Sequence, residues 1–444
     1  ALAHVLAAGD AFGGAAAGPA ERVNVEFVSA NPTGPMTAAG GRHAAYGDSL
    51  ARLLEFSGHD VTREYYINDV GGQVGRLGES IRARARGEQV PEGGYEGDYV
   101  RELAERIPGA ASDDAAVVAE RGVHLLIEKI RASMHAIGVD FDVWFSEGSL
   151  HSGEPSAVRH AFDELQARGE SFQAEGALWL RTTAHGDDKD RVLERSTGAH
   201  TYFASDIAYH LNKLERGFDR LIDVWGSDHH GYVGRMHAAF EAFGAPAGTL
   251  EIIIMQFVNL IERGERASMS KRRGDFVTLD ELIAQIGTDA ARFFMLQRSH
   301  DTTVDLDLDL AREQSNENPV YYVQYAHARI ASILRRAGAG AVAAALDEAG
   351  RFEGTLQAAE RTLVKKLLAF PEEVAEATER RAPHRIAAYA IELAQTFTAF
   401  YRDCQVVGAE GDGVESFRLA LSVATKRTIA RALDLLGVSA PDQM

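Results

Sequence analysis

Cysteine is nearly absent from this sequence, since Cys404 is the single cysteine in 444 residues. A chain with one cysteine cannot form an internal disulfide, and it has no cysteine cluster to bind zinc. This usage is typical of proteins in a reducing cytosol, so we predict a cytoplasmic location. We interpret Cys404 itself as a small buried residue rather than a nucleophile.

Long apolar runs are absent as well. No stretch approaches the roughly 20 apolar residues that a membrane-spanning helix needs, so a membrane is not an expected partner. Hydrophobic residues make up 45% of the chain and charged residues 25%, as in ordinary globular proteins. The length is enough for two or three domains, and we find no internal repeat.

An excess of positive charge is the third absence. The net charge is −19, which by itself argues against a polyanionic partner. The distribution is uneven: from Asn316 onward there are 15 Lys and Arg against 16 Asp and Glu, and the first 315 residues hold the other 31 against 49. Nucleic-acid binding depends on local basic patches, so we expect any such patch in the near-neutral C-terminal third.

The stretch from Val23 to Asp48 organises the chain. Apolar and polar residues alternate from Val23 to Phe27, which predicts a strand, and Asn31–Pro35 breaks regular structure. Thr37 is placed to cap a helix that ends at Gly58. Gly40 and Gly41 in its first turn leave an N-terminus that can bind phosphate, although such glycines also serve close packing.

Strands and helices alternate over the rest of the first 315 residues. We predict strands at 60–67, 176–180, 190–193, 220–225 and 251–261, and helices at 120–137, 202–215 and 232–243. This alternation indicates an α/β fold with a doubly wound parallel sheet, interrupted by a mostly helical insertion at about 72–198. Beyond Asn316 only helical stripes occur, at 323–334, 363–370, 386–400 and 419–436, which predicts an all-α bundle.

Two loops carry candidate phosphate and nucleoside chemistry. Lys271, in the charged loop Ser268–Asp275, suits a cation that closes over a triphosphate, and the alternative is a solvated basic loop. The loop precedes a helix start at Thr278. The segment Gly226–His230 follows a buried strand, at the edge where open sheets bind ligands. Its Asp-His-His run could also bind a metal ion, but no further ligand lies nearby at the spacing that a metal site needs.

A second group suits a cationic ligand. Glu26 points away from its apolar neighbours, and a buried carboxylate needs a cation. Tyr202 and Asp206 lie one helical turn apart and can address one pocket. Carboxylates and an amide such as Asn31 match a planar guanidinium. Asn68–Asp69 fits either an Asx turn or a ligand role.

Several segments resemble one family. The residues VEFVSANPTGP, then GR and GDSLARLLEFSGHDVTREYYINDVGGQV, resemble the first active-site segment of bacterial arginyl-tRNA synthetases, class I enzymes with a Rossmann-like fold. Ser268–Lys271 resembles the class I lysine signature, and NENPVYYVQYAHARI resembles the start of the anticodon-binding domain. The resemblance runs from Val23 to Met444 in four segments in the right order.

One departure stands out. The family usually has His-x-Gly-His at Thr37–Gly40, whereas this sequence has Thr-Ala-Ala-Gly. We predict that phosphate binding persists through backbone N–H groups, the Thr37 hydroxyl and His43, which lies about one turn beyond Gly40. The lysine signature also has Ser268 in place of its first Lys or Arg. The Asp-Ala-Leu-Arg tetrapeptide is degraded near Glu415–Arg418.

The resemblance implies roles for individual residues. The implied catalytic residues are Lys271, Thr37, Gly40 and His43. The implied ATP-binding residues are Gly40, Gly41, Gly226, Asp228, His229, Met269, Ser270 and Lys271. The implied arginine-binding residues are Glu26, Ser29, Asn31, Tyr202, Asp206 and His230. The implied tRNA-binding residues are Tyr321, Tyr322, Tyr325 and Arg329.

The resemblance also implies a reaction, the ATP-dependent ligation of L-arginine to tRNA(Arg) through arginyl-adenylate, in which arginine activation itself requires bound tRNA. It implies Mg²⁺ that comes with ATP, no metal site in the protein, and a monomer. Residues 1–21 would be the tail of an N-terminal domain otherwise missing, 22–315 the catalytic domain and 316–444 the helical anticodon-binding domain. The missing histidines support an alternative, a synthetase-like protein that binds tRNA or arginine without aminoacylation.

Overall fold

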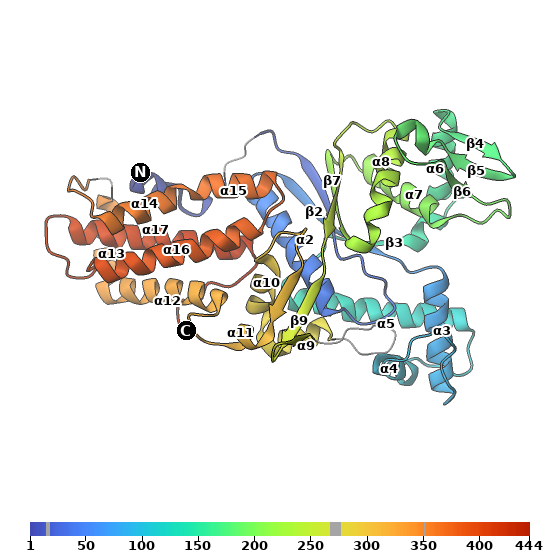
Figure 1. The fold of residues 1–444 in the computed structure, drawn as a ribbon, viewed down its shortest axis with the longest axis horizontal. Coiled ribbons are helices and arrows are strands. Elements are labelled where there is room, and N and C mark those ends of the chain that lie inside the picture. The colour runs from blue at the N-terminus through green and yellow to red at the C-terminus, as the bar shows by residue number, and fades with distance from the viewer. Residues whose placement is uncertain (15–17, 267–276, 350) are drawn as a thin grey trace.

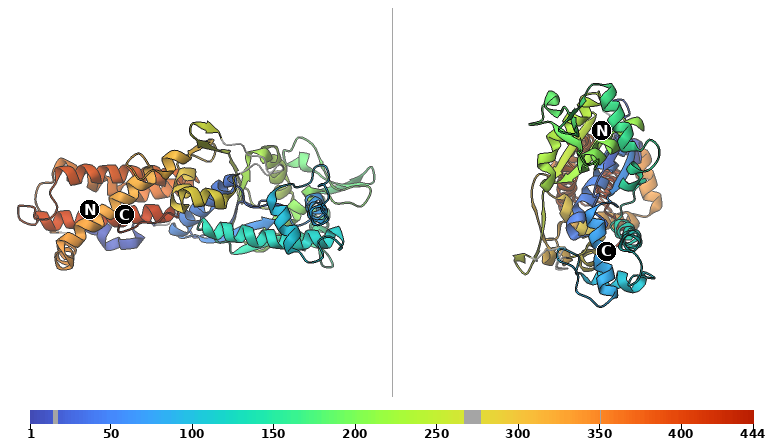
Figure 2. Two further views of the ribbon diagram at one scale, coloured as in Figure 1. Left: turned by 90° about the horizontal axis from the view of Figure 1, so that it is seen from below. Right: turned by 90° about the vertical axis from the view of Figure 1, so that its right-hand side faces the viewer.

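The computed structural model describes residues 1–14, 18–266, 277–349 and 351–444. Met269, Ser270 and Lys271 therefore lie outside the described residues. The molecule is elongated, with a helical bundle at one end and an α/β part at the other (Figure 1). The left view in Figure 2 shows the same division from below.

The main sheet confirms the predicted doubly wound parallel fold. It has five parallel strands in the order β3-β2-β1-β7-β8. The chain adds β2 and β3 on one side of β1 and then β7 and β8 on the other, so the order reverses at β1. These strands are β1 (Arg22–Glu26), β2 (Asp60–Ile67), β3 (Val143–Ser146), β7 (Arg220–Gly226) and β8 (Leu250–Met255).

Helix α2 (Ala38–Phe56) lies between the sheet and the bundle. Thr37 caps it, as predicted, because its Oγ1 accepts a hydrogen bond from the Gly40 N–H at 3.2 Å. The helix lies close to β1, since a Cβ at Gly47 would come within 2.1 Å of the Phe27 ring. One hydrophobic core then continues from β1 and α2 to helix α17 (Val414–Leu435) of the bundle.

The predicted insertion at 72–198 consists of two separate segments outside the main sheet rather than one. The first is α3 (Gly72–Ala85), α4 (Asp98–Arg106) and α5 (Ala115–Ala136), which share a small core. The chain then returns to the main sheet as β3, which is only four residues long and half-buried and therefore gives little sequence signal. The second is built from α6 (Ala157–Ala167) and the antiparallel strands β4 (Ser171–Ala174), β5 (Ala177–Leu180) and β6 (Arg191–Glu194).

The single strand predicted at 251–261 is also corrected. The structure has β8, at the edge of the main sheet, and then β9 (Val258–Glu262), which pairs with β10 (Glu265–Arg266) and β11 (Val304–Asp307) in another sheet. Arg42 of α2 donates hydrogen bonds to the carbonyls of Gln256 and Phe257 at 2.7 and 3.2 Å. This contact stabilises a break that the continuous apolar sequence does not show.

Over residues 316–349 and 351–444 the regular elements are all helices, as predicted. They are α12 (Pro319–Ala337), α13 (Ala339–Glu348), α14 (Ala358–Leu368), α15 (Phe370–Glu379), α16 (His384–Asp403) and α17. Helix α1 (Leu2–Ala8) packs against this bundle. The remaining helices of the α/β part are α7 (Tyr202–Glu215), α8 (Val233–Ala242), α9 (Leu279–Ile286), α10 (Thr288–Leu296) and α11 (Leu308–Arg312). Within the described ranges, no helix is long and apolar enough to cross a membrane.

Candidate active site

The candidate residues gather at the carboxyl edge of the main sheet. Because the strands are parallel, the segments that follow β1, β2, β3 and β7 open at the same edge. The N-terminus of α2 lies at this edge too, because α2 follows β1 through a short loop. That loop is held by Tyr99 of α4, whose hydroxyl donates to the Thr33 carbonyl at 2.8 Å.

Backbone hydrogen bonds join the start of α2 to residues 277–279, at the start of α9. The Ala38 N–H donates to the Val277 carbonyl at 3.0 Å, and the Leu279 N–H donates to the Met36 carbonyl at 2.9 Å. Thr37 and Thr278 pair between them, and each caps a helix, with Thr278 in the predicted capping box. The segment that immediately follows the lysine loop is therefore fixed against the N-terminus of α2.

Gly40 and Gly41 lie in close contact with neighbouring side chains. A Cβ at Gly40 would lie 2.4 Å from the sulfur of Met36, and a Cβ at Gly41 would lie 2.7 Å from Leu279. The packing explanation that the sequence left open therefore holds. Phosphate binding at this helix end would displace existing hydrogen bonds, because the Gly40 N–H donates to Thr37 Oγ1 and the Gly41 N–H donates to the Thr37 carbonyl at 3.3 Å.

His43 lies beside the Gly226–His230 segment. Its Nδ1 is buried without a hydrogen-bond partner. Burial, followed by the charge of Arg42, lowers the pKa of His43 to about 4, and Asp228 opposes this effect. The ring is therefore neutral at pH 7 and carries one N–H donor. The structure thus brings together His43, Asp228 and His229, which the sequence places in separate segments.

The chain turns sharply after β1. Val28 and Ser29 have φ values of 69° and 39°, in the left-handed region that residues other than glycine rarely adopt. In this turn the Ser29 hydroxyl donates to Glu26 Oε1 at 2.8 Å, and Ser29 Oγ accepts a hydrogen bond from the Tyr66 N–H at 3.1 Å. Such local strain is typical of functional sites, and no residue pattern in this segment predicted it.

Glu26 already has a cationic partner in the chain. Lys213 Nζ of α7 lies 2.5 Å from Glu26 Oε2 and 2.8 Å from Asp223 Oδ1, and the lysine side chain is fully buried. Burial raises the pKa of Glu26, and the charge of Lys213 opposes the rise. The burial of Glu26 therefore does not by itself require a cationic substrate.

A wider polar network fixes α7 on the sheet. Asp223 of β7 pairs with His210 at 2.7 Å. Glu64 of β2 accepts hydrogen bonds from the Tyr209 hydroxyl and from Arg216. Sequence analysis missed these residues, although charged residues such as Asp223 within apolar strands were an available signal.

Asp206 and Glu147 are two acidic groups without a cation. Asp206 accepts a hydrogen bond from the Tyr232 hydroxyl at 2.6 Å, and burial raises its pKa. Glu147, which follows β3, is 4% exposed, and burial and then the charge of Asp206 raise its pKa to about 7. In the part of the chain that the structure describes, neither pairs with a lysine or arginine. Sequence analysis did not find Glu147.

Asp69 supports Glu147 from both sides. Its carboxylate accepts hydrogen bonds from the Ser146 hydroxyl at 2.5 Å and from the Gly148 N–H at 2.9 Å. With its side-chain amide oriented to satisfy both ends, Asn68 donates to Glu147 at 3.1 Å. The ambiguous Asn68–Asp69 pair therefore positions another acidic residue.

Three predicted arginine ligands do not lie beside Asp206 and Glu147. Tyr202, at the start of α7, is 70% exposed and faces Gly71. Asn31 donates to Gln73 Oε1 at 3.0 Å. His230 lines a separate cavity of about 460 Å³ along β8, together with Glu251, Gln256, His300, Arg380 and Arg381. The structure therefore does not place His230 with Asp206.

The bundle presents an aromatic surface with one arginine. The rings of Tyr321 and Tyr325 stack at 6.1 Å, and the Arg329 guanidinium lies 4.6 Å from the Tyr325 ring and 5.5 Å from the Tyr401 ring. Tyr325 and Tyr401 are 36% and 42% exposed. Tyr322 instead packs inward and bonds to Thr398. Tyr401 was missed because it comes from a distant helix.

The comparisons with known proteins agree with this geometry. Residues 1–92 and 111–331 match the family described as tRNA synthetases class I (R), catalytic domain. Residues 323–444 match the DALR anticodon binding domain. The chain is 46% identical to the arginine–tRNA ligase of Bacillus subtilis and 47% identical to that of Kineococcus radiotolerans. These alignments cover 100% and 99% of the chain and 82% and 81% of the relatives.

Solved structures are similar as well. A Campylobacter jejuni structure described as an arginyl-tRNA synthetase matches with a TM-score of 0.90 and 31% identity, covering 100% of this chain and 98% of that one. The Thermus thermophilus arginyl-tRNA synthetase, at 24% identity, 96% and 83% coverage and a TM-score of 0.76, supports the fold alone. The sequence-based family prediction is confirmed: the chain belongs to the arginyl-tRNA synthetases, class I aminoacyl-tRNA synthetases with a DALR-type helical domain.

Proposed function

We propose that this protein attaches L-arginine to tRNA(Arg) with ATP. A carboxylate oxygen of arginine attacks the α-phosphorus, the bond to the β-phosphate breaks, and pyrophosphate leaves. A hydroxyl of the terminal ribose of the tRNA then attacks the carbonyl carbon, AMP leaves, and the hydroxyl proton passes to solvent. The observation that carries this proposal is the likeness to arginine–tRNA ligases over the whole of this chain, together with the pairing of Thr37 with Thr278.

The N-terminus of α2 would receive the ATP phosphates. Its donors would be the Thr37 hydroxyl proton and the N–H groups of Gly40 and Gly41, which now donate to Thr37 Oγ1 and to the Thr37 carbonyl and would turn to the phosphate. His43 would add a neutral N–H donor in place of the absent signature histidines. Such preorganised donors act where charge develops in the transition state.

Asp228 and His229 would contact the nucleoside of ATP, because they follow β7 beside His43. Gly226 allows the Asp228 carboxylate to fold back, since a Cβ there would lie 2.5 Å from Oδ1. Lys271, which is outside the described residues, would act on the phosphates as they rearrange. Among the described residues no group of three His, Cys, Asp or Glu side chains can hold a metal ion, so Mg²⁺ would be bound through ATP itself.

Asp206 would provide the charge that recognises the arginine side chain. It is half-buried and has no lysine or arginine partner among the described residues, whereas Glu26 is neutralised by Lys213. A guanidinium matches a carboxylate better than a neutral side chain does. Glu26 would contribute by orienting Ser29, and Tyr202 and Asn31 would lie at the mouth of the pocket.

The surface formed by Tyr321, Tyr325, Arg329 and Tyr401 would bind tRNA. Exposed aromatic rings and a guanidinium plane are typical partners for unstacked bases. A monomeric state and a cytoplasmic location stay predictions, which sedimentation and fractionation would test.

An aminoacylation assay with total tRNA tests the proposal. We expect charging with arginine and none with lysine or glutamate. The absence of histidines at Thr37 and Gly40 favours the second candidate, a non-catalytic tRNA- or arginine-binding protein. Binding of tRNA without any charging would support that candidate and contradict ours.

A further inference from the structure

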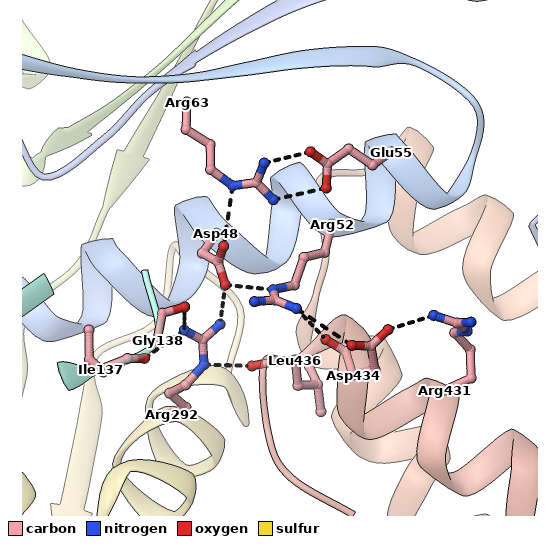
Figure 3. Close-up of polar contacts among 10 residues, drawn as sticks. All are labelled: Asp48, Arg52, Glu55, Arg63, Ile137, Gly138, Arg292, Arg431, Asp434 and Leu436. Carbon is pink, nitrogen blue, oxygen red and sulfur yellow. Dashed lines mark hydrogen bonds and ion pairs between the residues drawn. The ribbon is translucent and has the colours of Figure 1, made fainter. Parts of the chain in front are cut away.

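Asp48 joins three arginines in the interior. It lies in α2, is 2% exposed, and its Oδ2 accepts hydrogen bonds from Arg292 Nη2 at 2.6 Å and Arg52 Nε at 2.7 Å. Its Oδ1 accepts from Arg63 Nε at 3.3 Å (Figure 3). Burial would raise the pKa of Asp48, but the three guanidinium charges lower it below its usual value. We call these four residues the Asp48 cluster.

Arg292, from α10, extends the cluster to the end of the bundle. Its side chain is fully buried, its Nε donates to the Leu436 carbonyl at 2.8 Å, and its Nη1 donates to the Ile137 carbonyl at 2.9 Å (Figure 3). Gly437 lies directly on the guanidinium, since a Cβ there would come within 2.2 Å of Nη2, and its φ is +65°. The turn that ends α17 is therefore fitted to this one side chain.

Further contacts attach α2 to the bundle along its length. Arg52 Nη1 donates to the Asp434 carbonyl at 3.3 Å. The Tyr46 hydroxyl donates to the Arg381 carbonyl at 2.7 Å, and Ser57 bonds to Thr378. The opposite end of α2 carries the proposed phosphate site, ten residues or about 15 Å from Asp48. A shift of the bundle would therefore move the phosphate site, because a helix transmits displacement along its axis.

We propose that Arg292 is a positioning residue for arginine activation: it locks the end of α17 to α2, so that docking of the bundle sets the place of the ATP-binding end of α2. The inference rests on the proposed function of that helix end. A buried ion pair contributes little net stability against an apolar replacement but can select one geometry. Small misplacements far from the reacting atoms cost as much as about 100-fold in rate.

The substitution Arg292→Lys tests the inference in the full chain. Lysine keeps the charge but lacks the fork that reaches Asp48, Leu436 and Ile137 together. We expect the kcat for tRNA-dependent pyrophosphate exchange to fall about tenfold or the KM for ATP to rise about tenfold, with the Kd for tRNA unchanged. Gly437→Ala displaces the guanidinium from the other side and is expected to act in the same way.

Arg418→Lys is the matched control. Arg418 is also buried and ion-paired, with Glu360 at 2.7 Å, but all its partners lie within the bundle. Arg418→Lys is expected to lower Tm about as much as Arg292→Lys does, without changing the kcat of pyrophosphate exchange or the KM for ATP. Equal kinetics for Arg292→Lys and the control would overturn the inference, as would a loss of tRNA affinity that accounts for the whole defect.

Two further outcomes are distinguishable. If Arg292→Lys does not fold, Arg52→Gln replaces it, because Arg52 is at the partly exposed side of the cluster and links Asp48 to Asp434. Unchanged ATP parameters in Arg52→Gln and Gly437→Ala then contradict the inference. Absence of arginine charging by the unmutated protein would contradict the proposed function instead.

Discussion

Glu147 should make arginine binding depend on pH near neutrality. Burial and the charge of Asp206 raise its pKa to about 7, and Asp69, Tyr66 and Ser205 also face it. Only the ionised carboxylate attracts a cation, so binding of arginine should strengthen as the pH rises. With this pKa, about 10% of Glu147 is ionised at pH 6 and about 90% at pH 8. We therefore expect the Kd for arginine to fall by up to about tenfold over this range.

Titration calorimetry at pH 6, 7 and 8 measures this dependence. Glu147→Gln keeps the shape of the side chain and should remove most of the slope, whereas the distant exposed carboxylate of Glu353 provides a control, Glu353→Gln, that should keep it. The stability of the unliganded protein should show the opposite dependence on pH. Because the folded state holds the proton at a pH where the unfolded state has lost it, the contribution of Glu147 to stability falls as the pH rises toward 7. An unchanged Kd between pH 6 and 8, or the same slope in Glu147→Gln, would refute the reasoning.

Three other substitutions test the proposed sites. His43→Ala should lower tRNA-dependent pyrophosphate exchange at least about tenfold, or about 1.4 kcal/mol of barrier; an unaltered rate would exclude a role for that imidazole. Asp206→Ala should weaken arginine binding by about 2–5 kcal/mol in calorimetry, because the guanidinium loses its charged partner; equal affinity would remove Asp206 from the pocket. Tyr401→Ala should weaken tRNA binding by about 1–3 kcal/mol, the contribution of one stacked base, and so raise the KM for tRNA with kcat unchanged; an unchanged KM would show that tRNA does not contact this ring.

Local patterns predicted much of the fold. The alternation of strands and helices indicated the doubly wound sheet, and the caps at Thr37 and Thr278 were placed from spacing alone. These features depend on neighbours within one turn or one strand, so the sequence contains them. The change from strands to helices near Asn316 is of the same kind.

The missed features depend on distant residues. The chain breaks between β8 and β9 where Arg42, more than 200 positions earlier, binds the carbonyls of Gln256 and Phe257. Lys213 neutralises Glu26 across a comparable separation. Sequence spacing could place Glu26 on a buried face, but it could not identify the cation that meets it. The same limit concealed Tyr401 and Glu147 from the site prediction.

The close contact at Gly40 restricts how this protein can change. The sulfur of Met36 occupies the space where a side chain at position 40 would begin, 2.4 Å from its Cβ. A single Gly40→His exchange would therefore force the flexible Met36 side chain to move. Restoring His-x-Gly-His takes substitutions at Thr37, Ala39 and Gly40, so the route between the two forms of this active site passes through three positions and a shift of Met36.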